Sequence, residues 1–162
     1  MPGHDYAQGG AYFVTICVEG QAMLFGEIDG ATMRPNDCGR MIEATWYETV
    51  SRCNSVESGA FQLMPNHVHG LVIIHGIIVG PPATSLPDFV GAFKSTTTWL
   101  YSRAVRDGRW PAYDRRLWQR DYYEHLVRND RSRERILRYI AANPSRWAFD
   151  RENPRSIRPT DL

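Results

Sequence analysis

The segment that most constrains the fold of this chain is MPNHVHGLVII, residues 64–74. A Met-Pro-Asn turn precedes the two histidines and an apolar run, residues 71–74, follows them, which is typical of a strand with a buried face. Successive side chains of a strand point to opposite faces, so His67 and His69 share one face while Val68 points to the other. Two imidazoles side by side form half of a site for a divalent cation. The alternative is a pair of histidines with ordinary hydrogen bonds.

The size of the chain, 162 residues, is that of one globular domain. We expect a single domain over residues 1–162, with its core at about 11–147 and a polar tail at 148–162. Three cysteines without a Cys-x-x-Cys pair predict neither a disulfide framework nor a zinc knuckle, and they favour a reducing cytoplasm. The first ten residues are polar and the apolar runs are short, so neither export nor a membrane span is expected.

The basic residues are unevenly distributed, although the net charge is only +1. Residues 1–100 carry four basic and nine acidic residues, whereas residues 101–162 carry fifteen basic and nine acidic ones. All fifteen are arginine, and tyrosines and tryptophans lie between them. Guanidinium groups suit phosphate oxygens and aromatic faces suit unstacked bases, which favours a nucleic-acid-binding surface. The alternative is an arginine-rich genome composition, which the single lysine supports.

Several elements are expected before the histidine strand. Residues 11–18, rich in aromatic and β-branched side chains, predict a strand, and residues 22–33 predict a hairpin that turns at Asp29-Gly30. Asn36 or Asp37 is expected to cap a helix that ends near Arg52. Residues 60–63, after a Ser-Gly break, predict a strand that pairs with the histidine strand.

The second half of the chain predicts two helices and an extended segment. After a Gly-Pro-Pro connector at 80–82, Ser85 is expected to cap a helix that stops at Asp107-Gly108. Residues 118–127 are expected to be extended, and 131–142 to be helical until Pro144 ends the helix. This order predicts an α+β fold, an antiparallel sheet with helices on one face. For the helix that Ser85 caps, the predicted apolar stripe is Phe89, Phe93, Thr96, Leu100 and Ala104.

The last predicted helix carries a tyrosine and an asparagine one turn apart. Ile136, Leu137 and Ile140 define its apolar sector, and Tyr139 and Asn143 lie together at one shoulder. A phenolate can attack phosphorus, and an amide oxygen can join two histidines around a hard metal ion. The alternative for a helix tyrosine is a rim aromatic with its hydroxyl in water.

A family resemblance rests on five segments that occur in this order: YFVTICV, MPNHVHGLVI, GAFKSTTT, LWQRDYYEHLVRND and RYIAANPSRW. Together, over residues 12–147, they resemble the REP-associated tyrosine transposases, the single-tyrosine branch of the HUH endonuclease superfamily. The resemblance implies a ferredoxin-like HUH fold with a C-terminal helix that carries the nucleophile. It also implies a Mg²⁺ or Mn²⁺ ion and the cleavage and rejoining of single-stranded DNA beside an imperfect hairpin, through a 5′-phosphotyrosine intermediate.

The resemblance also implies roles for individual residues. His67 and His69 match the histidine ligands of the metal, Tyr139 matches the nucleophile, and Asn143 matches the polar ligand one turn later, where some relatives have glutamine. The positions expected to contact DNA or to lie near the site are Lys94, Ser95, Arg120, His125, Arg128, Arg135 and Arg138.

Rival interpretations stay open at this stage. A domesticated relative would bind structured single strands without cutting them. A cupin needs a glutamate soon after the histidine pair, and residues 71–74 offer none, while an amidohydrolase barrel needs a longer chain. Tyr122 and Tyr123 compete with Tyr139 as the nucleophile, but no ligand follows them one helical turn later. Relatives act either as monomers or as homodimers that exchange the tyrosine helix, and both arrangements fit this sequence.

Overall fold

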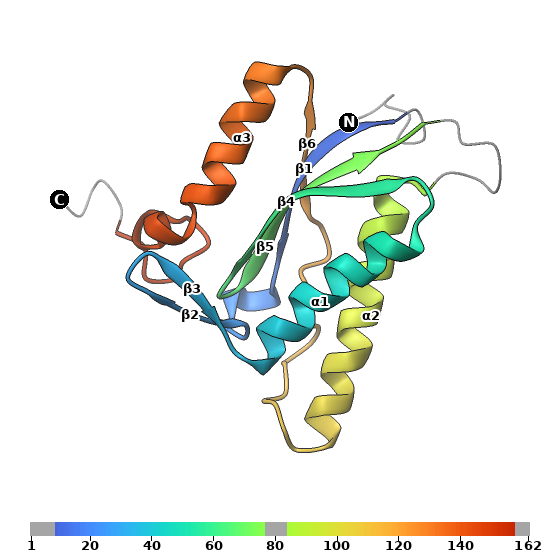
Figure 1. Ribbon diagram of the computed structural model, residues 1–162. Helices are drawn as coiled ribbons and strands as arrows, with labels where there is room; N and C mark the ends of the chain where they lie inside the picture. Colours follow the sequence, from blue (N-terminus) through green and yellow to red (C-terminus); the bar gives the residue numbers. More distant parts are fainter. Residues whose placement is uncertain (1–8, 77–83, 158–162) are drawn as a thin grey trace.

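The computed structural model describes residues 9–76 and 84–157, so the connector predicted at 80–82 lies outside the described residues. Four antiparallel strands form the central sheet in the order β4-β5-β1-β6 (Figure 1). They are β1 (Gly10–Cys17), β4 (Val56–Met64), β5 (His67–Ile74) and β6 (Tyr123–Val127). A separate hairpin, β2 (Gly26–Asp29) with β3 (Thr32–Pro35), confirms the predicted turn at Asp29-Gly30.

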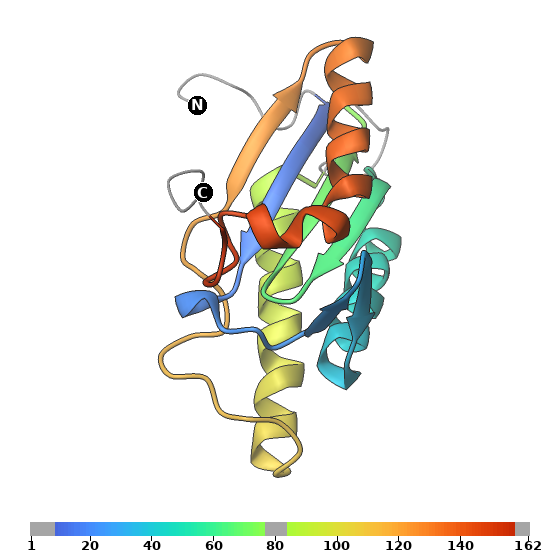
Figure 2. The same ribbon diagram turned by 90° about the vertical axis from the view of Figure 1, so that its left-hand side faces the viewer.

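Helices cover both faces of this sheet. α1 (Asp37–Arg52) and α2 (Leu86–Arg106) lie on one face, and α3 (Asp130–Ala142) lies on the other (Figures 1 and 2). Two short 3₁₀ helices complete the order, η1 (Glu19–Gln21) after β1 and η2 (Pro144–Phe149) after α3. The predicted α+β antiparallel fold is confirmed, but the expectation that all helices share one face is wrong for α3. Within the described ranges, no helix is both long and apolar enough to cross a bilayer.

Side-chain caps set the helix starts that the sequence predicted. The Asn36 side chain accepts a hydrogen bond from the Gly39 N–H (2.8 Å), and the Asn129 side chain accepts one from Ser132 (2.8 Å). At α2, Ser85 and Asp88 form a reciprocal capping box. Each cap satisfies N–H groups that have no partner within the helix, so the short polar residue before each apolar pattern determined where the helix begins.

The strand β1 divides the core because its side chains alternate between the two faces of the sheet. Tyr12, Val14 and Ile16 are buried in the larger cluster with the side chains of α1 and α2. Phe13 points the other way and packs with Ile136 and Ile140 of α3. The second face therefore has a small apolar contact that fixes α3, and the rest of that face is left for polar groups.

Two local predictions differ from the structure. On α2 the buried stripe includes Thr97 and Tyr101 in place of Thr96 and Leu100. A buried threonine is tolerated there because its hydroxyl donates to the Phe93 carbonyl (2.8 Å) and accepts from the Trp118 indole (2.9 Å).

The second difference is that β4 begins before the predicted break at 58–59. The strand continues through this Ser-Gly pair by a register shift between Ser58 and Phe61. Gly59 is needed because a Cβ there would lie 2.9 Å from the Leu71 side chain. The glycine thus marks a bulge with a close packing contact and does not end the strand.

The contact between Gly70 and Trp46 gives a test of this packing. A Cβ at Gly70 would lie 2.4 Å from the Trp46 ring, which is fully buried and whose Nε1–H donates to Ser58 (2.9 Å). We expect Gly70→Ala to lower the free energy of unfolding by about 1–3 kcal/mol, because the ring must move. Urea denaturation measures this difference.

Gly91→Ala is the control, because Gly91 lies within α2 and a Cβ there would meet nothing within 4 Å. It should raise the free energy of unfolding by about 0.5–1 kcal/mol, since alanine restricts the unfolded chain. Equal effects of the two substitutions would contradict the close contact between β5 and α1.

Candidate metal and nucleophile site

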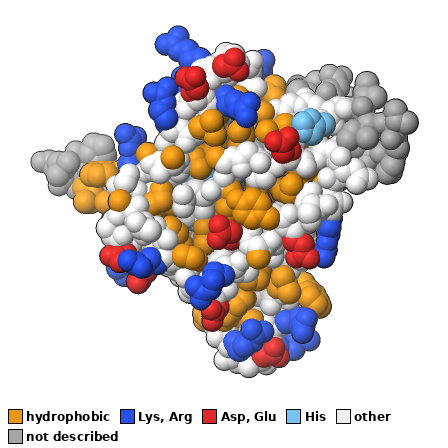
Figure 3. Space-filling model, in the orientation of Figure 1, with side chains coloured by type: hydrophobic (Ala, Val, Ile, Leu, Met, Phe, Trp, Pro, Cys, Tyr) orange, Lys and Arg blue, Asp and Glu red, His pale blue; other side chains and the backbone are white. Residues whose placement is uncertain are grey.

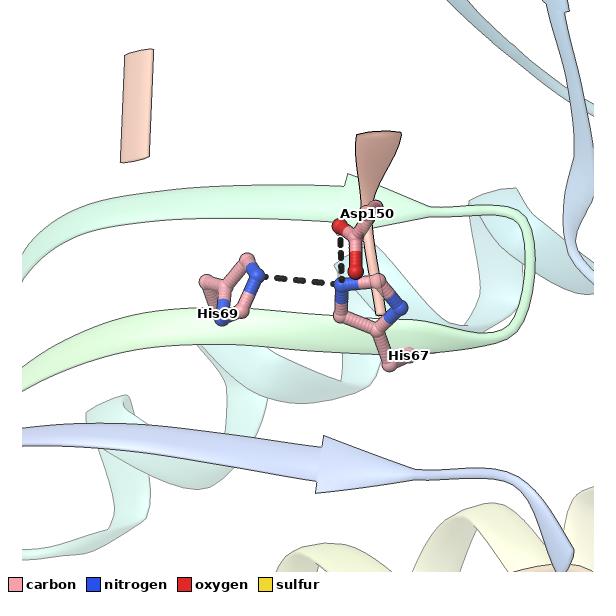
Figure 4. Close-up of side chains that lie close together, drawn as sticks. All are labelled: His67, His69 and Asp150. Atoms are coloured by element: carbon pink, nitrogen blue, oxygen red, sulfur yellow. Dashed lines mark hydrogen bonds and ion pairs between the residues drawn. The ribbon is translucent and has the colours of Figure 1, made fainter. Parts of the chain in front are cut away.

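The two histidines of β5 lie on the face of the sheet that α3 covers. Pairing with β1 places Thr15 opposite His69 and Cys17 opposite His67. Both imidazoles are almost fully buried, and their Nε2 atoms are 3.0 Å apart (Figure 4). The prediction that His67 and His69 share one face is confirmed by this geometry.

Asn66 fixes the orientation and the tautomer of His67. The Asn66 Nδ2 group donates to the carbonyls of Gln21 (3.2 Å) and Glu152 (2.7 Å), so its Oδ1 faces the ring. This oxygen accepts a hydrogen bond from His67 Nδ1–H (2.8 Å). With the proton held on Nδ1, the neutral ring presents the lone pair of Nε2 to the site.

Thr15 orients the ring of His69, because its hydroxyl oxygen lies 2.8 Å from His69 Nδ1. When the hydroxyl donates to Nδ1, His69 Nε2–H donates to His67 Nε2, and the pair is satisfied without a cation. When the hydroxyl accepts from Nδ1–H, both Nε2 lone pairs are free. The same threonine thus supports a metal-free and a metal-ligating arrangement, because a hydroxyl is both donor and acceptor.

Two oxygen-bearing side chains complete this cluster. Asp150 Oδ2 lies 3.7 Å from His67 Nε2, and ligand atoms of His67, His69 and Asp150 all lie within 4.8 Å of one another. Asn143 is 3% exposed, and its Oδ1 is buried without a hydrogen-bond partner among the described residues. A buried amide oxygen without a donor is costly, and a cation would satisfy it. The donor set, two imidazoles with an amide and a carboxylate oxygen, fits a divalent ion.

Burial sets the protonation state of these groups. Together with the charge of Arg151, it lowers the pKa of His67 well below 6.5 and that of His69 to about 4. Mutual repulsion of the two rings also lowers the pKa of His67, while the Asn143 side chain raises that of His69. Burial raises the pKa of Asp150, and the Glu152 backbone N–H opposes this. Both histidines are therefore neutral near pH 7, which is the form that binds metal ions.

Tyr139 lies at the mouth of the same site. Its ring centre is 5.4 Å from that of His69 and 5.8 Å from that of Phe13, and the side chain is 45% exposed. A cavity of about 350 Å³ lies beside Tyr139 and His69, lined by Phe13, Thr15, His69, Tyr123, Tyr139, Asp150, Arg151 and Glu152. A second cavity is lined by Tyr139, Asn143 and Asp150 among others. The phenol and the imidazoles therefore meet within one chain, and the predicted neighbours His67, His69, Tyr139 and Asn143 are brought together.

The residues predicted to contact DNA lie in three places. Arg135 and Arg138 line a groove along α3 that also includes Tyr139. His125 and Arg128 are exposed on β6 and directly after it. Lys94, Ser95 and Arg120 line a separate hollow beside α2.

Lys94 has a structural role in that hollow. Its ammonium group donates to the carbonyls of Gln119 (2.8 Å) and Arg120 (3.1 Å), so it holds the segment before β6 against α2. Burial lowers the pKa of this lysine. Its contribution to DNA binding stays a prediction.

Three residues of the site were missed from the sequence. Asn66 could have been found, because a buried asparagine directly before a His-x-His pair can orient the first ring. Thr15 follows from strand register, which a sequence does not give. Asp150 falls in the segment assigned to a polar tail, yet its carboxylate is 7% exposed at the site. The sequence around Asp150 does not indicate this role, because only the folding of the C-terminal segment brings the carboxylate to the histidines.

The buried histidines predict a pH-dependent stability. In the folded chain the pKa of His69 is about 4, below its ordinary value of 6.5, so the unfolded chain takes up the proton first as pH falls. In chelator, the free energy of unfolding should fall between pH 6.5 and 4, by about 1.4 kcal/mol per pH unit for each such histidine. His69→Gln should make the slope shallower by about one proton. Equal slopes in urea denaturation series would contradict the burial of a neutral His69.

Comparison with known proteins assigns the chain to a family. The sequence profile of IS200-like transposases matches residues 41–143. An uncharacterized protein of Haemophilus influenzae (strain Rd) is 32% identical over 164 residues, which cover 91% of this chain and 87% of that protein.

Solved structures agree on the fold. The REP-associated tyrosine transposase bound to a REP hairpin matches with a TM-score of 0.62 and 17% identity, over 89% of this chain and 72% of that chain. A proposed transposase of Deinococcus radiodurans R1 matches with a TM-score of 0.53 and 20% identity, over 86% of this chain and 95% of that chain. The fold predicted from the resemblance is thus confirmed. The profile match, which covers more than half of the chain, shows that this chain belongs to the IS200-like transposase family.

Proposed function

We infer that this protein is a metal-dependent single-stranded DNA endonuclease and strand transferase that acts beside a DNA hairpin through a phosphotyrosine intermediate. The observation that carries the proposal is the grouping of these side chains at one site. The Nε2 atoms of His67 and His69 are 3.0 Å apart, and the Tyr139 ring centre lies 5.4 Å from that of His69. Asn143 lines a cavity together with Tyr139. Family membership supports DNA transposition as the biological reaction. A solved structure of similar fold is bound to a REP hairpin, which supports a hairpin as the DNA partner.

His67, His69 and Asn143 would hold the Mg²⁺ or Mn²⁺ ion. When bound, such an ion supplies positive charge that neutralises the scissile phosphate and the departing 3′ oxygen. The neutral, oriented imidazoles are suited to this role, because Asn66 holds the proton of His67 on the nitrogen that faces away from the site.

Tyr139 would act as the nucleophile. Its hydroxyl oxygen attacks phosphorus in line, the bond from phosphorus to the 3′ oxygen breaks, and the phenol proton passes to solvent while the 3′ oxygen gains one. The products are a 5′-phosphotyrosine and a free 3′-OH. Because the new linkage is also a phosphodiester, a 3′-OH can attack it in reverse without ATP, which makes strand transfer achievable with one tyrosine.

The surface beside Tyr139 is suited to a DNA strand. Arginines of α3 and η2 line the groove that reaches Tyr139, and they are Arg131, Arg135, Arg138 and Arg146. On the face shown in Figure 3, basic side chains gather over α3 at the top and around the lower end of α2, among acidic ones. Guanidinium groups in such a groove can bind successive phosphates, which supports a strand path along α3.

Replacing the nucleophile tests the reaction directly. With hairpin-bearing single-stranded DNA and Mn²⁺, wild-type protein should form a denaturant-resistant adduct, and Tyr139→Phe should lower it below detection while DNA binding is kept. Tyr123→Phe is the matched control, because Tyr123 lines the same cavity and is 49% exposed. An adduct with Tyr139→Phe, or its loss only with Tyr123→Phe, would sink the assignment. Binding by wild type without any adduct would favour the catalytically silent binder.

Metal removal tests the cofactor. Chelator should abolish the adduct, and added Mg²⁺ or Mn²⁺ should restore it, since the phosphate charge must be neutralised for a phenol to approach. The measurement is the fraction of labelled DNA that migrates with the protein on a denaturing gel. Unchanged adduct formation in chelator would contradict the role given to the histidines.

A further inference from the structure

We propose that Asp150 is a further ligand of the metal ion, and the one that supplies the negative charge of the site. This inference rests on the proposed function, because the ion is the one held by His67 and His69. It adds a carboxylate from the C-terminal segment to ligands that come from β5 and the end of α3.

The chain after α3 brings Asp150 to the histidines. Asn143 ends the helix, and η2 then turns the chain back towards the sheet, where the Asp150 N–H donates to the Trp147 carbonyl (3.1 Å). The Asp150 side chain reaches over His67 from this segment (Figure 4). Asn143 and Asp150 therefore lie at the two ends of one short 3₁₀ segment, and both line one cavity with Tyr139.

The two oxygens of this carboxylate have different surroundings. Oδ1 accepts a hydrogen bond from the Glu152 backbone N–H (2.8 Å), and the Glu152 carbonyl in turn accepts from Asn66 (2.7 Å). Oδ2 lies 3.7 Å from His67 Nε2. Among the described residues, no lysine or arginine forms an ion pair with Asp150. One oxygen is thus held by the backbone while the other faces the site without a fixed cation.

Asp150 does not occupy the place of a carboxylate that merely orients a histidine. Such a group accepts a hydrogen bond from the ring nitrogen that faces away from the metal. In His67 that nitrogen is Nδ1, and Asn66 already accepts its proton. Asp150 faces Nε2, the nitrogen whose lone pair is free for a cation, and so it lies where a ligand would lie.

Charge gives a second reason. Two neutral imidazoles and the Asn143 amide carry no formal charge, whereas Mg²⁺ and Mn²⁺ prefer oxygen donors that include carboxylates. Asp150 is the carboxylate that the structure groups with the two histidines. The buried Asn143 Oδ1 has no hydrogen-bond partner of normal geometry among the described residues, and Asn143 lines a cavity with Asp150, so a cation beside them would also satisfy this oxygen.

The experiment is a Mn²⁺ titration of metal-stripped, full-length protein without DNA, followed by the electron paramagnetic resonance signal of the free ion. Asp150→Asn keeps the shape of the side chain and removes its charge. We expect its Mn²⁺ affinity to fall by about tenfold or more. Circular dichroism and melting in chelator establish that the variant is folded. Glu43→Gln is the control, since it removes one carboxylate charge from the exposed surface of α1, away from the site, and its affinity should stay within about twofold of wild type.

Equal Mn²⁺ affinity of folded Asp150→Asn and wild type would overturn the proposal, as would an equal loss of affinity in Glu43→Gln. A second variant, Asp150→Glu, should bind more tightly than Asp150→Asn, because it restores the charge. These readouts do not depend on DNA cleavage. Tyr139→Phe should bind Mn²⁺ like wild type, so the adduct assay can fail, and with it the proposed function, while the Asp150 assignment stands.

Discussion

The antiparallel pairing of β1 with β5 is the constraint on which the rest of this structure depends. Because alternate side chains point to opposite faces, one register gives the sheet two different surfaces. Val14 and Val68 are buried on the face that α1 and α2 cover, whereas Thr15 and His69 meet on the other. A slip of one residue would expose the apolar set and bury the imidazoles among α1 and α2, so folding and site assembly depend on the same hydrogen-bond ladder.

The polar face is held together by a network that centres on Asn66. One amide joins the turn between β4 and β5 to η1, through Gln21, and to the C-terminal segment, through Glu152. Its remaining oxygen sets the tautomer of His67. Buried polar groups are costly unless every donor and acceptor is satisfied. The amide of Asn66 has protein partners for both its nitrogen and its oxygen, whereas the buried Asn143 oxygen has none among the described residues and is available to a cation. The same residues therefore stabilise the C-terminal segment and prepare the ligands.

Much of the fold could be predicted because local physics decides it. The caps at Asn36, Ser85 and Asn129 and the strand with its histidine pair follow from residue chemistry over a few positions. The buried stripe of α2 differs from the predicted one at Thr97 and Tyr101, because hydrogen bonds with Trp118 and Pro111 outside the helix make a buried threonine and tyrosine favourable. The strand β4 was predicted too short, since Gly59 looks like a break unless the Leu71 side chain that packs on it is known.

By itself, the sequence determined the elements, the shared face of His67 and His69, and the helical spacing of Tyr139 and Asn143, because all of these depend on periodicity within one element. Tertiary structure alone decided that α3 lies across the sheet from α1 and α2, that Thr15 meets His69, and that Asp150 reaches His67 from a segment of ordinary polar composition. These contacts join parts of the chain that are distant in sequence. Their positions depend on how whole elements pack together, and no short stretch of residues encodes that packing.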